Sequence, residues 1–130
     1  MNKKRKNTAS DIEACNPVTL AEAARATVIA CLNDTFRTTF TGGQVMLTQG
    51  ILALGGEAQR QVLEKVRAFE AFCTDNDPYG EHDFGSFEHG NERIGWKIDY
   101  YDPSLTYGSD NPADPTVTRR VLTIMLMSEW

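Results

Sequence analysis

Apolar residues recur at helical spacing in two stretches of the chain. The first follows Thr19, a suitable helix cap, with Glu22 three positions later as in a capping box, and the predicted helix runs to about Asn33. The second predicted helix covers roughly residues 57–73, where Val62, Val66, Phe69 and Cys73 are spaced by four, three and four. The face of the first helix that we expect to be buried comprises Leu20, Ala24, Thr27, Val28, Cys31, Leu32 and Thr35.

Alternation with a period of two predicts the strands. Residues 36–48 alternate around Gly42-Gly43 and are interpreted as a β-hairpin, followed by one helical turn at residues 51–54. A second hairpin is expected from strands near 82–89 and 93–102, turning at Gly90-Asn91-Glu92. In its second strand Ile94, Trp96, Ile98 and Tyr100 are predicted to face the helices, and Lys97, Asp99 and Tyr101 to face away.

The stretch 121–127 is apolar on both parities, which is typical of a central strand covered on both faces. Leu122, Ile124 and Leu126 are assigned to one side, and Val121, Thr123, Met125 and Met127 to the other. If the helices lie on one face only, we expect a loop or a second subunit to cover the other, with a homodimer preferred. Residues 102–115, with three prolines, are expected to form a long irregular connection. The predicted fold class is α+β, an antiparallel sheet of four to five strands with two helices packed against it.

Length and composition fit one domain. The chain has 130 residues, of which 1–16 are interpreted as a flexible basic arm and 17–130 as a single α+β domain. No apolar region follows the basic residues as in a secretory signal, and no apolar stretch is long enough to span a bilayer. The three cysteines lack a C-x-x-C pair, so we expect buried structural thiols in a cytoplasmic protein.

Charge is distributed unevenly. The formal net charge is -5, but residues 75–114 hold ten acidic residues against only Arg93 and Lys97, a net -8. Such a field repels nucleic acids and anionic membranes and favours a basic protein surface, including one that normally binds nucleic acid. The candidate partner-binding residues are Asp75, Asp77, Glu81, Asp83, Glu88, Glu92, Asp99, Asp102, Asp110 and Asp114.

One loop concentrates ionisable side chains. Asp75, Asp77, Glu81, His82 and Asp83 are the candidate ligands of a divalent cation such as magnesium, since carboxylates on a curled loop suit a hard ion. A calcium loop is incomplete because Ser86 stands where a bidentate Glu is required, and zinc is disfavoured because His82 and His89 have opposite strand parity unless Gly85 forms a bulge. The more frequent role of such acids is to accept hydrogen bonds from backbone N–H groups of a turn, so no cofactor is predicted.

Several motifs resemble an uncharacterised bacterial family, domain of unknown function 3768. The resemblance covers about residues 30–130 and implies a small bacterial protein of a kind at home on plasmids and other mobile elements, without assigning catalytic residues. The motifs are Asn33-Asp34-x-Phe36-Arg37, Gly42-Gly43, Thr48-x-Gly50, Val66-Arg67-x-Phe69, the run from Asp75 to Gly85, the run from Trp96 to Asp102, Pro112-Ala113-Asp114-Pro115 and the run from Arg120 to Leu126.

Two functions remain open at this point. The preferred interpretation is a small non-enzymatic interaction protein whose acidic 75–114 surface binds a basic protein. In its sharpest form this is an inhibitor of a nucleic-acid-handling defence system, of anti-CRISPR or antirestriction type. The alternative is a small metal-assisted hydrolase or nuclease that uses the Asp75–Asp83 loop. A metal enzyme predicts carboxylates converging in a pocket, whereas an inhibitor predicts carboxylates spread over a surface.

Overall fold

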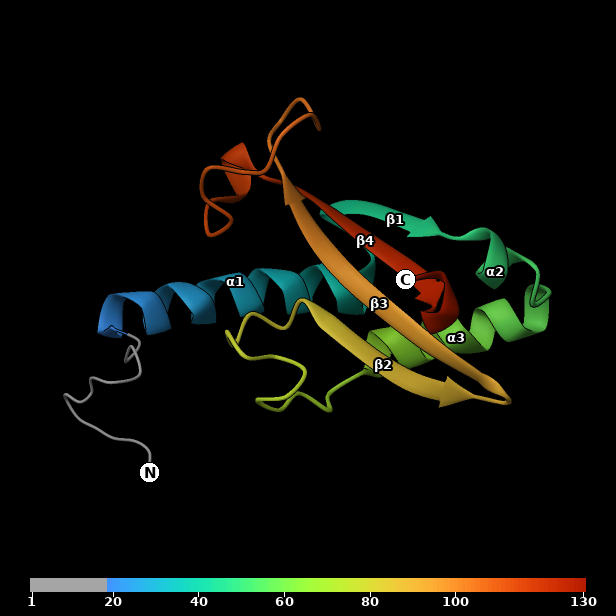
Figure 1. Ribbon diagram of the computed structural model, residues 1–130. Coiled ribbons are helices and arrows are strands. Elements are labelled where there is room, and N and C mark those ends of the chain that lie inside the picture. The colour runs from blue at the N-terminus through green and yellow to red at the C-terminus, as the bar shows by residue number, and fades with distance from the viewer. Residues whose placement is uncertain (1–18) are drawn as a thin grey trace.

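A computed structural model describes residues 19–130 of the chain (Figure 1). The predicted basic arm, residues 1–16, and Cys15 lie outside the described residues. The elements in chain order are α1 (Leu20–Thr39), β1 (Gly43–Leu47), α2 (Gln49–Leu52), α3 (Gly56–Ala68), β2 (Phe84–His89), β3 (Glu92–Tyr101), the 3-10 turn η1 (Pro115–Val117), β4 (Arg119–Leu126) and the 3-10 turn η2 (Met127–Glu129).

The four strands form one mixed sheet in the order β1-β4-β3-β2. β4 pairs antiparallel with β3, and β3 antiparallel with β2, whereas β1 pairs parallel with β4. The predicted α+β class with two main helices is therefore confirmed, and the sheet is mostly rather than wholly antiparallel. Figure 1 shows α1 and α3 on the same side of this sheet.

Helix α1 begins as predicted and continues further. Thr19 accepts a hydrogen bond from the Glu22 amide, and the Glu22 side chain accepts one from the Thr19 amide, so the capping box is confirmed. The predicted end at Asn33 is wrong, because the helix continues to Thr39. The predicted buried face is also wrong: Leu20 is 91% exposed, and the buried residues are Ile29, Ala30, Asn33, Phe36 and Arg37.

The hairpin predicted over residues 36–48 is wrong. Its first half is the last turn of α1, which ends at Phe40 in the left-handed conformation. Gly42, at φ 98°, then turns the chain into β1, whose partner is the distant β4. The single helical turn expected near residues 51–54 is present as α2.

Helix α3 ends at Ala68 and not at Cys73 as predicted. Arg37, buried on α1, donates hydrogen bonds to the carbonyl groups of Val66 and Arg67 at the end of α3, where backbone carbonyls lack partners within the helix. Beyond this end Phe69 packs edge-on against Trp96 with ring centroids 5.6 Å apart. The expectation of buried thiols is wrong for Cys31 and Cys73, which are both exposed.

The second hairpin and its faces are confirmed. β2 and β3 pair from Phe84 opposite Lys97 to His89 opposite Glu92. Ile94, Trp96 and Ile98 belong to the core, with Tyr100 packed against it. No bulge interrupts Gly85, which pairs with Trp96 in regular register; a Cβ there would come within 2.6 Å of the Trp96 ring nitrogen and 2.8 Å of Phe69.

β4 is the predicted central strand, with Leu122 and Ile124 in the core beneath the helices. On its other face Val121 is only 7% and Met125 only 4% exposed within a single chain. Their burial therefore does not require a second copy, and the homodimer stays a prediction. The same sheet face carries Met46, 54% exposed, and Phe84, whose ring contacts the 67% exposed Trp130 at a centroid distance of 5.5 Å.

Residues 102–114 connect β3 to η1 irregularly, as predicted. Within residues 19–130, no helix is both long enough and apolar enough to cross a membrane.

Candidate functional site

Eight of the ten candidate partner-binding acids lie at one end of the sheet. β2 begins there, β3 ends there and β4 begins there, so the antiparallel pairing brings their flanking loops together (Figure 1). Glu88 and Glu92 are the exceptions, since they lie at the opposite end near the β2–β3 turn, where Glu88 pairs with Arg93 at 2.8 Å. The acidic end is defined here as Asp75, Asp77, Glu81, Asp83, Asp99, Asp102, Asp110 and Asp114.

Helix α1 holds the loops of the acidic end in place. The Asn33 side-chain amide donates to the carbonyl of Glu81 at 2.9 Å, and Arg25 donates to the Asn111 side chain at 3.4 Å. Arg120, at the start of β4, donates to the carbonyl of Pro112 at 2.5 Å and to Asn33 at 2.7 Å. The loops before β2 and after β3 are therefore both attached to α1, and the loop after β3 is also attached to β4.

Asp77 shapes the loop before β2. It is 8% exposed, and one carboxylate oxygen accepts hydrogen bonds from the amides of Glu81 and His82 at 3.0 and 3.1 Å. Gly80, at φ 71°, and His82, at φ 57°, adopt the left-handed backbone that this tight turn requires. Asp77 thus accepts hydrogen bonds from the backbone of a turn, which is the more frequent role of acids in such a loop.

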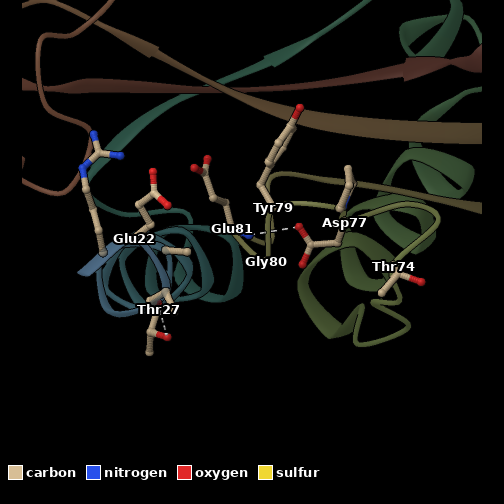
Figure 2. A pocket seen from close by; sticks show the side chains of 11 residues that line it. Glu22, Thr27, Thr74, Asp77, Tyr79, Gly80 and Glu81 are labelled. Carbon is tan, nitrogen blue, oxygen red and sulfur yellow. Dashed lines mark hydrogen bonds between the residues drawn. The ribbon is translucent and has the colours of Figure 1, made fainter. Parts of the chain in front are cut away.

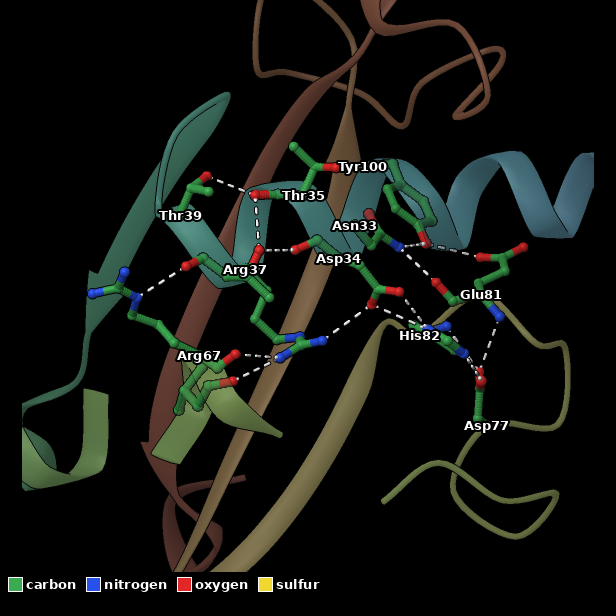
Figure 3. A network of polar contacts seen from close by, with 12 residues as sticks. Asn33, Asp34, Thr35, Arg37, Thr39, Arg67, Asp77, Glu81, His82 and Tyr100 are labelled. Carbon is green, nitrogen blue, oxygen red and sulfur yellow. Dashed lines mark hydrogen bonds and ion pairs between the residues drawn. The ribbon is translucent and has the colours of Figure 1, made fainter. Parts of the chain in front are cut away.

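His82 fastens this loop to α1. Its Nδ1 lies 2.9 Å from Asp34 and its Nε2 lies 3.7 Å from Asp77 (Figure 3). Its ring also stacks on Phe72 at a centroid distance of 4.0 Å. Asp34 also accepts a hydrogen bond from Arg37 at 3.0 Å. Both ring nitrogens of His82 therefore face carboxylates of the protein.

A buried polar chain links Glu81 to the sheet. The Tyr100 hydroxyl accepts from Asn33 and donates to Glu81, both at 2.9 Å. Burial raises the pKa of Tyr100 far above its ordinary value, so its hydroxyl keeps its proton and remains a donor. Burial also lowers the pKa of the Arg120 guanidinium, which lies 5.2 Å from the Tyr100 ring centre. This chain positions Glu81 rather than leaving it free.

The carboxyl group of Asp83 is affected by its burial and by the neighbouring acids of the acidic end. Burial, first, and then the charges of Glu81, Asp77 and Asp99 raise the pKa of the Asp83 carboxyl above its ordinary value. A raised carboxyl pKa lowers the free energy of unfolding at neutral pH, because the charged form of the acid is disfavoured in the folded state. The nearby cation Lys97 pairs with Asp99 at 2.5 Å.

The remaining acids divide into capping and free side chains. Asp102 accepts from Ser104, Thr106 and Tyr107, and Asp114 caps η1 through Thr116; these hydrogen bonds lower the pKa of both carboxyls. Asp75 and Asp110 are exposed, and the structure gives neither side chain a hydrogen bond or ion pair within residues 19–130. These two are the freest carboxylates of the acidic end.

The predicted metal ligands do not converge on one point. Asp77 is engaged by two backbone amides, Glu81 accepts from Tyr100, and His82 is turned to Asp34. In the part of the chain from residue 19 onward, no three His, Cys, Asp or Glu side chains are arranged to hold a metal ion. Asp77, Glu81 and His82 are therefore engaged within the protein and are not directed at a common point.

A cavity of about 640 Å³ opens beside the acidic end, between the first half of α1 and the loop from Thr74 to Glu81 (Figure 2). Glu22, Asp77 and Glu81 supply its acidic lining, and Arg25 is the one basic residue among those that line it. Tyr79, on its outer side, is 81% exposed.

A family model described as "Protein of unknown function (DUF3768)" matches residues 47–129. The chain belongs to this family. The DUF3768 match includes the loop before β2, the hairpin and β4, but not α1. It is therefore shorter than the predicted range of about 30–130, and the motifs Asn33-Asp34-x-Phe36-Arg37 and Gly42-Gly43 lie outside it. No curated protein and no solved structure matches the chain.

Sequence reasoning missed the α1 side of the site, namely Asn33, Asp34 and Arg37. A signal was present: Asn33 and Arg37 follow the buried Ile29 at successive intervals of four, which places polar residues on one line with a core residue. Polar side chains at such positions are buried only with partners, and here the partners are the loop before β2, Arg120 and the end of α3.

Proposed function

We propose that this protein is a non-enzymatic interaction protein whose acidic end binds a basic surface of another protein. One observation carries the proposal: the loop before β2, the end of β3 and the loop after β3 bring eight carboxylates to one end of the sheet, where burial and the charges of Glu81, Asp77 and Asp99 raise the pKa of Asp83. Such a concentration of like charge steers a basic partner into place and is partly neutralised by it. We place the protein in the cytoplasm, where the exposed thiols of Cys31 and Cys73 stay reduced.

The finer form of the proposal is an inhibitor of a nucleic-acid-handling protein, of anti-CRISPR or antirestriction type. A groove that binds nucleic acid is lined with Lys and Arg that contact phosphates. Exposed carboxylates such as Asp75 and Asp110, projecting from separate loops, offer negative charges to those same side chains. Occupying the groove then blocks it without any chemical step.

The enzymatic alternative has less support in the site. An Asp–His pair such as Asp34 and His82 is one part of a general-base arrangement. Yet the second ring nitrogen of His82 faces Asp77, and within residues 19–130 no Ser, Thr, Tyr or Cys side chain is hydrogen-bonded to this histidine. The hydrogen bonds of His82 position a loop.

A pull-down from bacterial lysate at about 0.05 and 0.5 M salt tests the proposal, with every retained protein identified by mass spectrometry. The test variant is Asp75→Asn/Asp110→Asn, and the matched control is Glu57→Gln/Glu92→Gln, which removes the same charge away from the acidic end. We expect the wild type and the control to retain a strongly basic protein at low salt only. The test variant should retain roughly tenfold less, since each exposed charge pair contributes up to about 1 kcal/mol.

Two results would contradict the proposal. The first is equal retention of the same protein by the Asp75/Asp110 variant and by the wild type. The second is that the wild type retains no basic protein at low salt. Either result removes the acidic end as a docking surface, because that surface is defined by its charge and must respond to both charge removal and screening.

A further inference from the structure

The cavity between α1 and the loop from Thr74 to Glu81 is a groove, and its walls have two kinds of surface. Ala23, Ala26 and Pro78 provide apolar walls, beside the ring of Tyr79. Figure 2 shows Glu22, Asp77 and Glu81 among the side chains that line it. A groove of this kind suits an extended basic segment, whose long apolar stems pack on the walls while the charged ends reach the carboxylates.

Carboxylate oxygens remain available in the groove. Glu22 uses Oε1 in the capping box, and Glu81 uses Oε1 to accept from Tyr100. Within residues 19–130 the structure gives no hydrogen bond to the Oε2 atom of either residue. Arg25, the basic residue of the lining, is directed to Asn111. The groove thus has negative charge that the described part of the chain does not neutralise.

The chain itself contains a basic segment within reach. Lys3, Lys4, Arg5 and Lys6 hold four of the thirteen basic residues of the chain. Twelve residues lie between Lys6 and Thr19, so the thirteen steps from one to the other span up to about 45 Å when extended. The groove begins at Glu22, one helical turn after Thr19. The length of the intervening chain and the positive charge of this segment therefore both make it a suitable occupant of the groove.

We propose that Lys3, Lys4, Arg5 and Lys6 occupy the groove of their own chain and compete there with the basic partner. This rests on the proposed function, because it makes the segment an intramolecular competitor for part of the same acidic surface. Tethering gives the segment an effective concentration on the order of millimolar, so a weak electrostatic contact is populated. A partner must displace it, which lowers the apparent affinity of every basic ligand for the groove.

The experiment compares the wild-type chain with the variant Lys3→Gln/Lys4→Gln/Arg5→Gln/Lys6→Gln. The probe is a synthetic peptide with the sequence of residues 1–10, titrated at about 0.05 M salt while amide resonances are followed by NMR. We expect the variant to bind the peptide about three- to tenfold more tightly, since its own competitor has been removed. The peptide should shift the resonances of residues 22–27 and 77–81. Without peptide, the same resonances should already differ between the two chains.

A substitution in the groove locates the contact. Added to the variant, Ala23→Arg places a cation in the groove and should weaken peptide binding at least threefold, whereas Ala24→Arg, on an exposed neighbouring position outside the lining, should change it less than twofold. Both residues lie on α1, and Arg is a good helix former, so the two chains should fold alike.

The outcomes separate this inference from the proposed function. Equal peptide affinity of the wild type and the four-Gln variant overturns the inference and leaves the acidic end as a binding surface. Peptide shifts confined to residues outside the groove also overturn it, as do resonances of the free wild type that depend on protein concentration, which would place the segment on a second copy. No binding by either chain at low salt counts against the proposed function itself.

Discussion

Asn33 has no exposed surface, yet its polar side chain sits on the core-facing side of α1. Its amide nitrogen donates to the Glu81 carbonyl and the Tyr100 hydroxyl, and its oxygen accepts from Arg120. These hydrogen bonds join a helix, a loop and two strands, so Asn33 links the loop before β2 to both β3 and β4. Buried polar groups of this kind are costly to disrupt because each partner then loses its own hydrogen bond.

We therefore predict that Asn33→Ala lowers the free energy of unfolding by about 2–4 kcal/mol, because the buried Nε of Arg120 and the Glu81 carbonyl both lose the hydrogen bond that Asn33 gives them. The measurement is the urea midpoint at constant m-value. Thr35→Ala, an exposed position on the same helix, should change the free energy by less than about 0.5 kcal/mol. Similar effects of the two substitutions would show that the network contributes little.

At the scale of elements, the C-terminal turn η2 is tied to the start of α2. One carboxylate oxygen of Glu129 accepts from the Thr48 hydroxyl at 2.6 Å and from the Leu126 amide at 2.8 Å, and the other accepts from the Gly50 amide at 2.9 Å. These hydrogen bonds, that of Thr48 first, lower the pKa of Glu129. A single carboxylate thus fixes how the end of the chain meets β4 and α2.

Because the pKa of Glu129 is lower in the folded protein, its stabilisation is present above the ordinary glutamate pKa and is lost as pH falls through the lowered value. We predict that Glu129→Gln reduces stability at pH 7, speeds hydrogen exchange of the Gly50 amide, and has little effect below about pH 3. The control Glu70→Gln changes an exposed acid whose side chain forms no hydrogen bond within residues 19–130. If the effect of Glu129→Gln is constant from pH 7 to pH 3, the stabilisation does not come from the charged form of Glu129.

Elements whose pattern depends on local sequence could be predicted, and those that depend on distant partners could not. The capping box at Thr19, the β2–β3 hairpin and the two faces of β3 follow from neighbouring residues, and all three are confirmed. The prediction that β1 forms half of a hairpin is wrong, because its partner is β4, more than seventy residues away, and local alternation carries no information about such a partner. The role of Asp77 in a turn could be predicted from the composition of its loop, whereas the contacts of that loop with α1 could not.

The face of α1 shows the same limit. Its real buried face includes Asn33 and Arg37, whose partners come from the loop before β2 and the end of α3. Hydropathy alone assigns the exposed stripe of Leu20, Val28 and Cys31 to the core, because it scores a satisfied polar residue as if it faced water. The acidic segment could be read from the sequence, but its division between the two ends of the sheet required the strand pairing.

At the scale of the whole molecule, one carboxylate of the acidic end, Asp83, opposes folding at neutral pH. The raised pKa of Asp83 means that its charge is unfavourable in the folded protein at neutral pH, and that this cost disappears as pH falls and the carboxyl becomes protonated. A surface kept at a cost in stability is expected where the same charges serve binding. A change that weakens the negative electrostatic field of the acidic end should therefore raise stability and weaken binding.

We predict that Asp83→Asn raises the urea midpoint at pH 7, that the gain shrinks toward pH 3, and that the same substitution weakens retention of a basic partner. Asp75→Asn, at an exposed position, should weaken retention with a change in stability below about 0.5 kcal/mol. Raising salt from about 0.05 to 0.5 M contracts the screening length from over ~10 Å to under ~5 Å, so it should stabilise the free wild-type chain while it dissociates the complex. If salt moves stability and binding in the same direction, or if Asp83→Asn destabilises the chain at pH 7, the repulsion at the acidic end is not what links them.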